Sequence, residues 1–362
     1  MYFYEMREDF FSKLYVVLIS IVGFINIETV IDIVGVQWYY LSVVNSIGLL
    51  CVFATKILRK NFDVSSFFKN PQNTFYFLFF LFCVISITTS INLSVSLIAI
   101  SKIFISLSSL IILSQLKPFK NSTEFITILF TIYLVFEVYL SLKGYFDISA
   151  VTEFKKSMAE IYMRGATGNK NITAASIAFK IPFAYLLVRK YTNIFTRGFL
   201  LFLLTVSFFN LFILSSRAIF VSYSCTLLFL FFGNLIISLK SKKAKKHFLK
   251  TLIVFISPII ISFWISNSLL TDDADRLSKR ISSINTEDAS TASRLRYYEK
   301  GFRYFLKNPI FGSGIGNWKL ISIKIDSDQI NSYIIPYVAH NDFIEVLTEI
   351  GFFGGVFYLL FV

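Results

Sequence analysis

Long apolar stretches, separated by short polar segments, dominate the pattern of residues along the chain. We count ten stretches near the length of roughly 17 to 25 residues that an α-helix needs to cross a bilayer. They run near Leu14–Ile27, Tyr39–Ile57, Phe75–Thr89, Val95–Leu116, Phe125–Leu142, Ile172–Val188, Gly198–Leu214, Ala218–Leu239, Thr251–Leu269 and Phe343–Val362. Because the apolar runs are continuous and do not alternate, they predict helices rather than barrel strands. The expected fold is therefore an all-α polytopic membrane protein with about ten transmembrane helices.

The longest polar segment divides the chain into three parts. Residues 1–270 would hold nine helices with short loops, and residues 271–340 one large loop. Residues 341–362 would begin a further helix. Since the chain stops in the apolar run Leu360, Phe361, Val362 without a polar flank, we expect further helices to follow.

Composition agrees with a membrane protein, and the charges indicate its orientation. The chain is 55% hydrophobic and 16% charged with a mean hydropathy of +0.67, which excludes a disordered protein or an ordinary cytosolic enzyme. Of the net charge of +13, the N-terminus and the loops on its side contribute 17 basic and 5 acidic residues. By the positive-inside rule this side is cytoplasmic, the large loop faces outward, and no nucleic acid is needed to explain the charge.

Cysteine usage adds no metal or disulfide site. Cys51, Cys83 and Cys225 all fall within predicted helices, so neither a disulfide framework nor a zinc spacing is present.

The large loop contains one amphipathic segment, TASRLRYYEKGFRYFLKN. Apolar residues recur at spacings of three and four, namely Leu295, Tyr298, Phe302 and Phe305. Thr291 or Ser293 can cap the start of this helix, and Asn308 with Pro309 ends it. The simplest interpretation is a helix that lies on the membrane surface.

A glycine-rich stretch, PIFGSGIGNW, follows the amphipathic helix. Its glycines permit a tight backbone path and a close approach to another group. It is no dinucleotide fingerprint, because no strand precedes it and Asn317 stands where a third fingerprint glycine should fall.

Polar residues gather where the last predicted helix begins: His340, Asn341, Asp342, Glu345 and Glu349. Carboxylates stabilise a helix N-terminus, so Asp342 and Glu345 have a structural explanation as well as a functional one.

Three charged residues near or within the spans leave alternatives open. Arg217, between two apolar runs, could extend to the interface, but anion binding is the stronger interpretation because no acid is near it in sequence. Lys102 and Lys180 could reach the interface or pair with Glu137.

The residues predicted to face outward suit a phosphorylated ligand. Arg164, Arg217 and Arg294 can each contact a diphosphate through two parallel hydrogen bonds. His340 titrates near neutral pH and could take a proton from an attacking hydroxyl. No carboxylate-rich metal site is apparent, so the arginines could supply the positive charge that a divalent cation supplies elsewhere.

Three segments resemble the O-antigen ligase and O-antigen polymerase superfamily of bacterial surface-polysaccharide enzymes. They are SRLRYYEKGFRYFLKNPIFGSGIGNW with HNDFIEVLTEIGFFGG, then RGATGNKNITAASIAFKIP, and SSRAIF between adjacent spans. The resemblance implies a membrane C-type, inverting glycosyltransferase that uses neither metal nor cofactor. Its donor would be a glycan on undecaprenyl diphosphate, at the outer face of the bacterial inner membrane.

The resemblance also implies residue roles. Arg217 and Arg294 match the arginines near the donor diphosphate, and His340 matches the histidine that acts as general base or orients the acceptor. Arg296 is a rival of Arg294, since two residues along a helix it faces differently. Residues of supporting or less certain role are Arg164, Asn169, Asn171, Asn341 and Glu345.

The acceptor stays open at the level of sequence. A ligase would transfer the glycan to a lipid A–core sugar, and a polymerase to another lipid-linked repeat unit; we favour the ligase. A flippase for lipid-linked oligosaccharide is the rival from another class, but charge or broken helices in paired positions of two halves would then be expected. Here the marked residues gather in outward loops of the second half.

Overall fold

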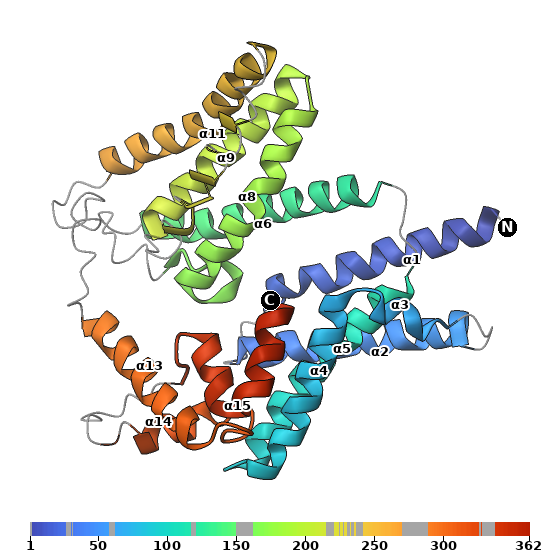
Figure 1. The fold of residues 1–362 in the computed structure, drawn as a ribbon. Coiled ribbons are helices and arrows are strands. Elements are labelled where there is room, and N and C mark those ends of the chain that lie inside the picture. Colours follow the sequence, from blue (N-terminus) through green and yellow to red (C-terminus); the bar gives the residue numbers. More distant parts are fainter. Residues whose placement is uncertain are drawn as a thin grey trace. The chain divides into compact units, whose positions relative to one another are not determined.

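A computed structural model gives the fold of the chain. It describes residues 2–26, 30, 32–57, 62–116, 121–149, 162–214, 221–223, 225–226, 228–229, 232, 235–236, 242–269, 289–325, 327 and 337–362. All regular structure in these ranges is helical, with no strand, as the sequence predicts (Figure 1).

Seven described helices are long and apolar enough to cross a membrane. They are Ile33–Lys56, Pro71–Thr89, Leu93–Gln115, Ser122–Asp147, Lys170–Lys190, Ile194–Leu214 and Asp342–Phe361. Each coincides with one of the ten predicted spans, so the chain is an all-helical, multi-pass membrane protein.

The other three predicted spans are not among the seven. The first falls on α1 (Tyr2–Ser20) and a 3-10 turn (Ile21–Phe24), and α1 carries several charged residues in its first half. Most of the eighth lies outside the described residues. The ninth belongs to α11 (Lys242–Leu269), whose apolar part, Leu252–Ser268, is shorter than the spans above.

The helices form two compact units. Unit 1 comprises residues 1–22, 37–119 and 285–362, and unit 2 comprises residues 23–36 and 120–284.

In unit 1 the last helix packs against two early ones. Helices α4 (Pro71–Ile85) and α5 (Leu93–Gln115) share a core with α15 (Asp342–Phe361), as Figure 1 shows. Aromatic pairs fill the contact between α4 and α15, with ring centroids 4.6 Å apart for Tyr76 and Phe361 and 5.5 Å apart for Phe79 and Tyr358. Such pairs add to the apolar burial that holds the helices together.

The remaining described helices of unit 1 are shorter or lie beside this core. They are α1, most of α2 (Ile33–Val52), its π-helical end (Phe53–Ile57), α3 (Val64–Phe68), a 3-10 turn (Ser86–Thr89), α13 (Ala289–Lys307) and α14 (Trp318–Ile325).

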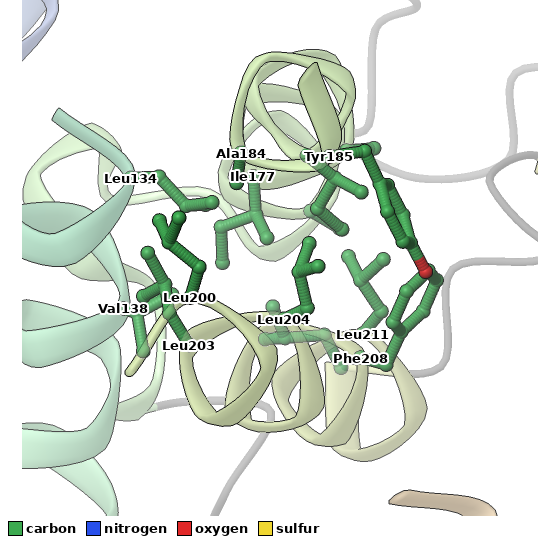
Figure 2. Packing of buried hydrophobic residues seen from close by; sticks show 14 of the residues in the cluster. Leu134, Val138, Ile177, Ala184, Tyr185, Leu200, Leu203, Leu204, Phe208 and Leu211 are labelled. Atoms are coloured by element: carbon green, nitrogen blue, oxygen red, sulfur yellow. The ribbon is translucent and has the colours of Figure 1, made fainter. Parts of the chain in front are cut away.

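Unit 2 is built from α6 (Ser122–Ser149), α8 (Lys170–Lys190), α9 (Ile194–Leu214) and α11. Figure 2 shows aliphatic side chains of α6, α8 and α9 that meet in one core, among them Leu134, Ile177 and Leu204, which are fully buried. Apolar faces on three helices therefore close the core.

One buried ion pair joins two spans of unit 2. The Lys180 Nζ of α8 lies 2.5 Å from the Glu137 Oε2 of α6, and the two residues are only 7% and 3% exposed. Ser176 Oγ donates to the same carboxylate at 2.9 Å. Of the alternatives that the sequence leaves open for Lys180, the structure selects pairing with Glu137. Both residues lie near the middle of their helices, where an unpaired charge is expensive.

Breaking this pair should destabilise the protein more than replacing it. Glu137→Gln leaves Lys180 buried without a counter-charge, and we expect a loss of about 3–5 kcal/mol in the free energy of unfolding. The double variant Glu137→Leu, Lys180→Met should recover most of that loss, since no charge then stays buried. Equilibrium unfolding in mixed micelles measures both.

The exposed pair of Lys190 and Glu124, 2.6 Å apart in the same unit, supplies the control. Lys190→Gln should cost less than about 1 kcal/mol. Equal costs for Glu137→Gln and Lys190→Gln would contradict the expectation.

Candidate functional site

The amphipathic helix of the large loop is α13, and it ends at Lys307 as predicted but begins earlier, at Ala289. Its packing face differs in part from the apolar stripe of the sequence. Phe305 is buried, whereas Leu295 and Phe302 stay 53% and 45% exposed. The contact centres instead on Gly301, which lies close to Ile344, Thr348 and Trp318. A residue without a side chain lets α13 approach α15, and this moves the buried face away from Leu295.

The glycine-rich stretch follows α13 and packs on a break in α15. Gly351 has φ +74°, which interrupts the helix, and the Phe352 N–H donates to the Pro309 carbonyl at 2.7 Å. At Gly312, with φ +59°, a side chain would collide with the backbone of Thr348 and Glu349. The close approach that the glycines predict is therefore an approach to the backbone of α15.

Glu349 fixes the other end of this stretch. Its carboxyl, in a residue 3% exposed, accepts from the Gly316 N–H at 2.8 Å and from the Trp318 N–H at 2.6 Å. Trp318 opens α14, so the carboxyl also satisfies a free N–H at the start of that helix. Glu349 thus has a structural role.

Asn317 connects the glycine-rich stretch to the turn between α4 and α5. The residue is fully buried, and its side-chain amide donates to Ser96 Oγ at 2.9 Å and to Ser90 Oγ at 3.1 Å. Its Oδ1 accepts from the Asn92 N–H at 3.0 Å. Asn317, which stands in place of the third fingerprint glycine, therefore anchors the glycine-rich stretch.

Four hydrogen bonds shape the corner around His340 at the start of α15. Asn341 caps the helix through its Oδ1, which accepts from the Phe343 and Ile344 N–H groups at 3.1 and 3.3 Å. Glu345 Oε2 accepts from the Ala339 N–H at 2.8 Å. The Tyr298 hydroxyl of α13 donates to the His340 carbonyl at 3.1 Å. These contacts hold the His340 backbone at φ +59°, a conformation that a residue other than glycine seldom adopts.

The side chain of His340 is exposed, and its pKa lies below the ordinary value. Partial desolvation is the larger cause, and the positive charge of Arg294 is the second. Arg294 lies one helical turn before Tyr298, so both residues lie on the face of α13 that is turned toward His340. The imidazole is consequently neutral at pH 7 and can accept a proton.

Arg296 has different surroundings from its rival Arg294. Its guanidinium carbon lies 5.5 Å from the centre of the neighbouring Tyr297 ring, and the residue is partly buried, whereas Arg294 is exposed. The two arginines therefore face differently, as their spacing predicts.

The segment with Arg164, Asn169 and Asn171 forms the start of α8 in unit 2. The Arg164 carbonyl accepts from the hydroxyls of Thr167 and Thr173, and Asn169 Oδ1 caps α8 by accepting from the Asn171 N–H at 2.9 Å. Asn169 thus has a structural function, while the side chains of Arg164 and Asn171 are exposed. Arg217 lies outside the described residues.

Sequence reasoning missed Tyr298 as a partner of His340. It assigned Tyr298 to the apolar face of α13. The one signal in the sequence was that Tyr298 lies four residues after Arg294, and so on the same side of the helix.

Glu349→Gln should loosen the glycine-rich stretch. An amide has one acceptor oxygen in place of two, so either Gly316 or Trp318 loses its partner. A buried N–H left without an acceptor costs about 1–3 kcal/mol, which predicts exchange about five- to a hundredfold faster for the amides of residues 312–320. Hydrogen exchange read by mass spectrometry measures this. Glu299→Gln, which removes only the exposed partner of Arg303, should leave that peptide unchanged.

Arg294→Gln should raise the pKa of His340. Removing the positive charge makes protonation of the imidazole easier, so its titration moves upward toward the value of about 6.5 for a free histidine. Histidine NMR on the purified protein follows the titration, with the His340 signal assigned by its loss in His340→Asn. Arg303→Gln on the same helix is the matched control, and an equal shift in both variants would refute the role of Arg294.

Comparison with known families adds to this geometry. Residues 200–359 match the family model described as O-antigen ligase (Wzy_C). The match contains Arg217, Arg294, the glycine-rich stretch and His340, but not Arg164, Asn169 or Asn171. Comparisons with curated proteins and with solved structures gave no match. Residues 200–359 are therefore similar to an O-antigen ligase domain.

Proposed function

We propose that the protein transfers a glycan from undecaprenyl diphosphate to a sugar hydroxyl of an acceptor. The observation that carries the proposal is the His340 corner within the matched O-antigen ligase domain. A neutral histidine, a neighbouring arginine and an exposed position are together what a transfer from a charged donor requires.

The chemistry follows from the residues at this corner. His340 takes the proton from the acceptor hydroxyl, or orients that hydroxyl, as its oxygen attacks the anomeric carbon of the donor. The bond from that carbon to the diphosphate oxygen breaks, and undecaprenyl diphosphate leaves with the electron pair. One displacement of this kind inverts the anomeric configuration. Arg294 and Arg217 stabilise the charge that grows on the leaving group.

The other predicted residues have supporting roles in this proposal. Asn341 and Glu345 keep His340 in position, as their bonds at the start of α15 suggest. Arg296, and Arg164 with Asn169 and Asn171, are further candidates for contacts to the diphosphate or the glycan. We infer no metal and no cofactor in the reaction.

The proposed setting is the bacterial inner membrane, with a cytoplasmic N-terminus and the loop of residues 271–340 outside. The helices on either side of that loop, including about ten spans within residues 1–362, would form a membrane C-type glycosyltransferase.

Two acceptors are compatible with this donor chemistry. A ligase would use lipid A–core, and an O-antigen or exopolysaccharide polymerase would use a second lipid-linked repeat unit. We favour the ligase because the matched family model is described as an O-antigen ligase. A transporter of lipid-linked oligosaccharide remains the alternative of another class, in which His340 would have no chemical task.

Deletion of the gene tests the function, and complementation tests the site. Loss of long surface glycan with accumulation of lipid-linked polymer supports a ligase, whereas core with a single repeat unit supports a polymerase. His340→Asn should fail to complement, because it removes a general base that contributes about 10²–10⁴-fold in rate. Asparagine tolerates the positive φ of this position, so the fold of the corner is preserved.

Arg294→Lys should also fail to complement, since the point charge of lysine does not replace the planar guanidinium. Arg217→Ala should fail as well, because it removes the positive charge. Arg303→Ala on the outer face of α13 is the matched control and should complement fully. Full activity of the His340 and Arg217 variants would refute the enzyme proposal, as would unchanged surface glycan in the deletion strain. Strong inhibition by a chelator would argue against metal-independent transfer.

A further inference from the structure

A groove of about 560 Å³ lies along α8 in unit 2. The walls come from α8, from Phe208 of α9, from Phe255 of α11, and from Ser222, Tyr223 and Thr226. The larger side chains of α8 in the wall include Phe179 and Tyr185. The volume falls in the range of about 300–1,000 Å³ that is typical of small-molecule sites. None of the described residues that line it belongs to the predicted transfer site.

The walls are apolar because two tyrosine hydroxyls are used within the protein. Pro182 lacks an N–H, which would leave the Ala178 carbonyl of α8 without its helical partner. The Tyr223 hydroxyl donates to that carbonyl at 2.7 Å. The Tyr185 hydroxyl donates to the Phe255 carbonyl of α11 at 2.8 Å. Both hydroxyls are thus bonded to backbone carbonyls, and the rings form the wall.

This arrangement makes the groove a preformed feature of unit 2. The Tyr185 and Phe255 rings stack with centroids 4.0 Å apart, and the Tyr223 ring packs edge-on against Phe208. Each tyrosine ring is therefore held by a hydrogen bond as well as by a ring contact.

Charge is concentrated at one end of the groove. Arg189, exposed in the last turn of α8, is the charged residue among the described lining residues. Lys190 follows it, and Arg197 lies in the first turn of α9, after a connection of only three residues. Glu124 pairs with Lys190 at 2.6 Å, so three basic residues stand against one acid at the end with Arg189. The positive-inside rule places this end on the cytoplasmic side.

We propose that this groove binds a hydrocarbon chain of an anionic phospholipid, with the phosphate of the head group at Arg189. An apolar channel that ends in a guanidinium complements such a lipid, and basic pockets between spans on the cytoplasmic side are known to suit anionic head groups. The glycan donor does not fit equally well. Its diphosphate is proposed to meet Arg217 and Arg294, which are predicted to face the opposite side of the membrane. The inference goes beyond the proposed function and does not rest on it.

Native mass spectrometry of the full chain in detergent tests the inference, with phosphatidylglycerol and phosphatidylcholine of the same acyl chains as probes. We expect phosphatidylglycerol to bind about fivefold more tightly, the contribution of one basic residue near an anionic head group. Arg189→Gln should abolish this preference, whereas the matched control Arg197→Gln should keep it. Equal binding of the two lipids, or a preference that survives Arg189→Gln, would overturn the proposal.

A second pair of variants tests where the chain lies. Ala175 lines the groove, so Ala175→Phe should fill it and remove binding of both lipids. Ala54, an exposed alanine of another span, does not line the groove, and Ala54→Phe should bind as before. Retained binding in Ala175→Phe would refute the groove as the site. Undecaprenyl phosphate is the third probe. If it displaces phosphatidylglycerol at an equal or lower concentration, the groove is a polyprenyl site instead.

Discussion

The hydrocarbon interior of a bilayer offers no water to a backbone polar group, and the rest of this structure follows from that constraint. Continuous helices satisfy it over most of the described chain. Where a helix is interrupted, another part of the protein supplies the missing partner. At Gly351 the freed N–H of Phe352 bonds to the Pro309 carbonyl, and beside Pro182 the Ala178 carbonyl accepts from Tyr223. Each interruption therefore specifies a contact between segments far apart in sequence.

Helix α15 shows how such contacts organise the proposed site. Its first turn fixes the His340 corner through Asn341 and Glu345, and two turns later Glu349 and the break at Gly351 hold the glycine-rich stretch. One helix thus supports both the His340 corner and the glycine-rich stretch. The rigid support matters because a general base has to be held within hydrogen-bonding reach of its substrate.

Much of this could be predicted. Seven of the ten predicted spans coincide with helices able to cross a membrane, and the end of α13, the tight approach of the glycines and the acidic first turn of α15 were expected. The apolar period of α13 predicted a helix on the membrane surface and did not indicate the contact of Gly301 with α15, because a residue without a side chain leaves no mark in a hydrophobic pattern. Tyr298 was missed because its partner is a backbone carbonyl 42 residues away, which leaves no trace in a local pattern.

The sequence by itself determined the helical membrane class, the expected orientation and the residues that could carry chemistry. Hydropathy, loop charge and residue type are local quantities, so they can be read along a chain. Only the tertiary structure decided the partners: Lys180 with Glu137, Glu349 with the amides of Gly316 and Trp318, and His340 with Arg294 and Tyr298. Those pairings depend on which helix faces meet and on which buried groups then need a counter-charge or a hydrogen bond, and packing alone sets both.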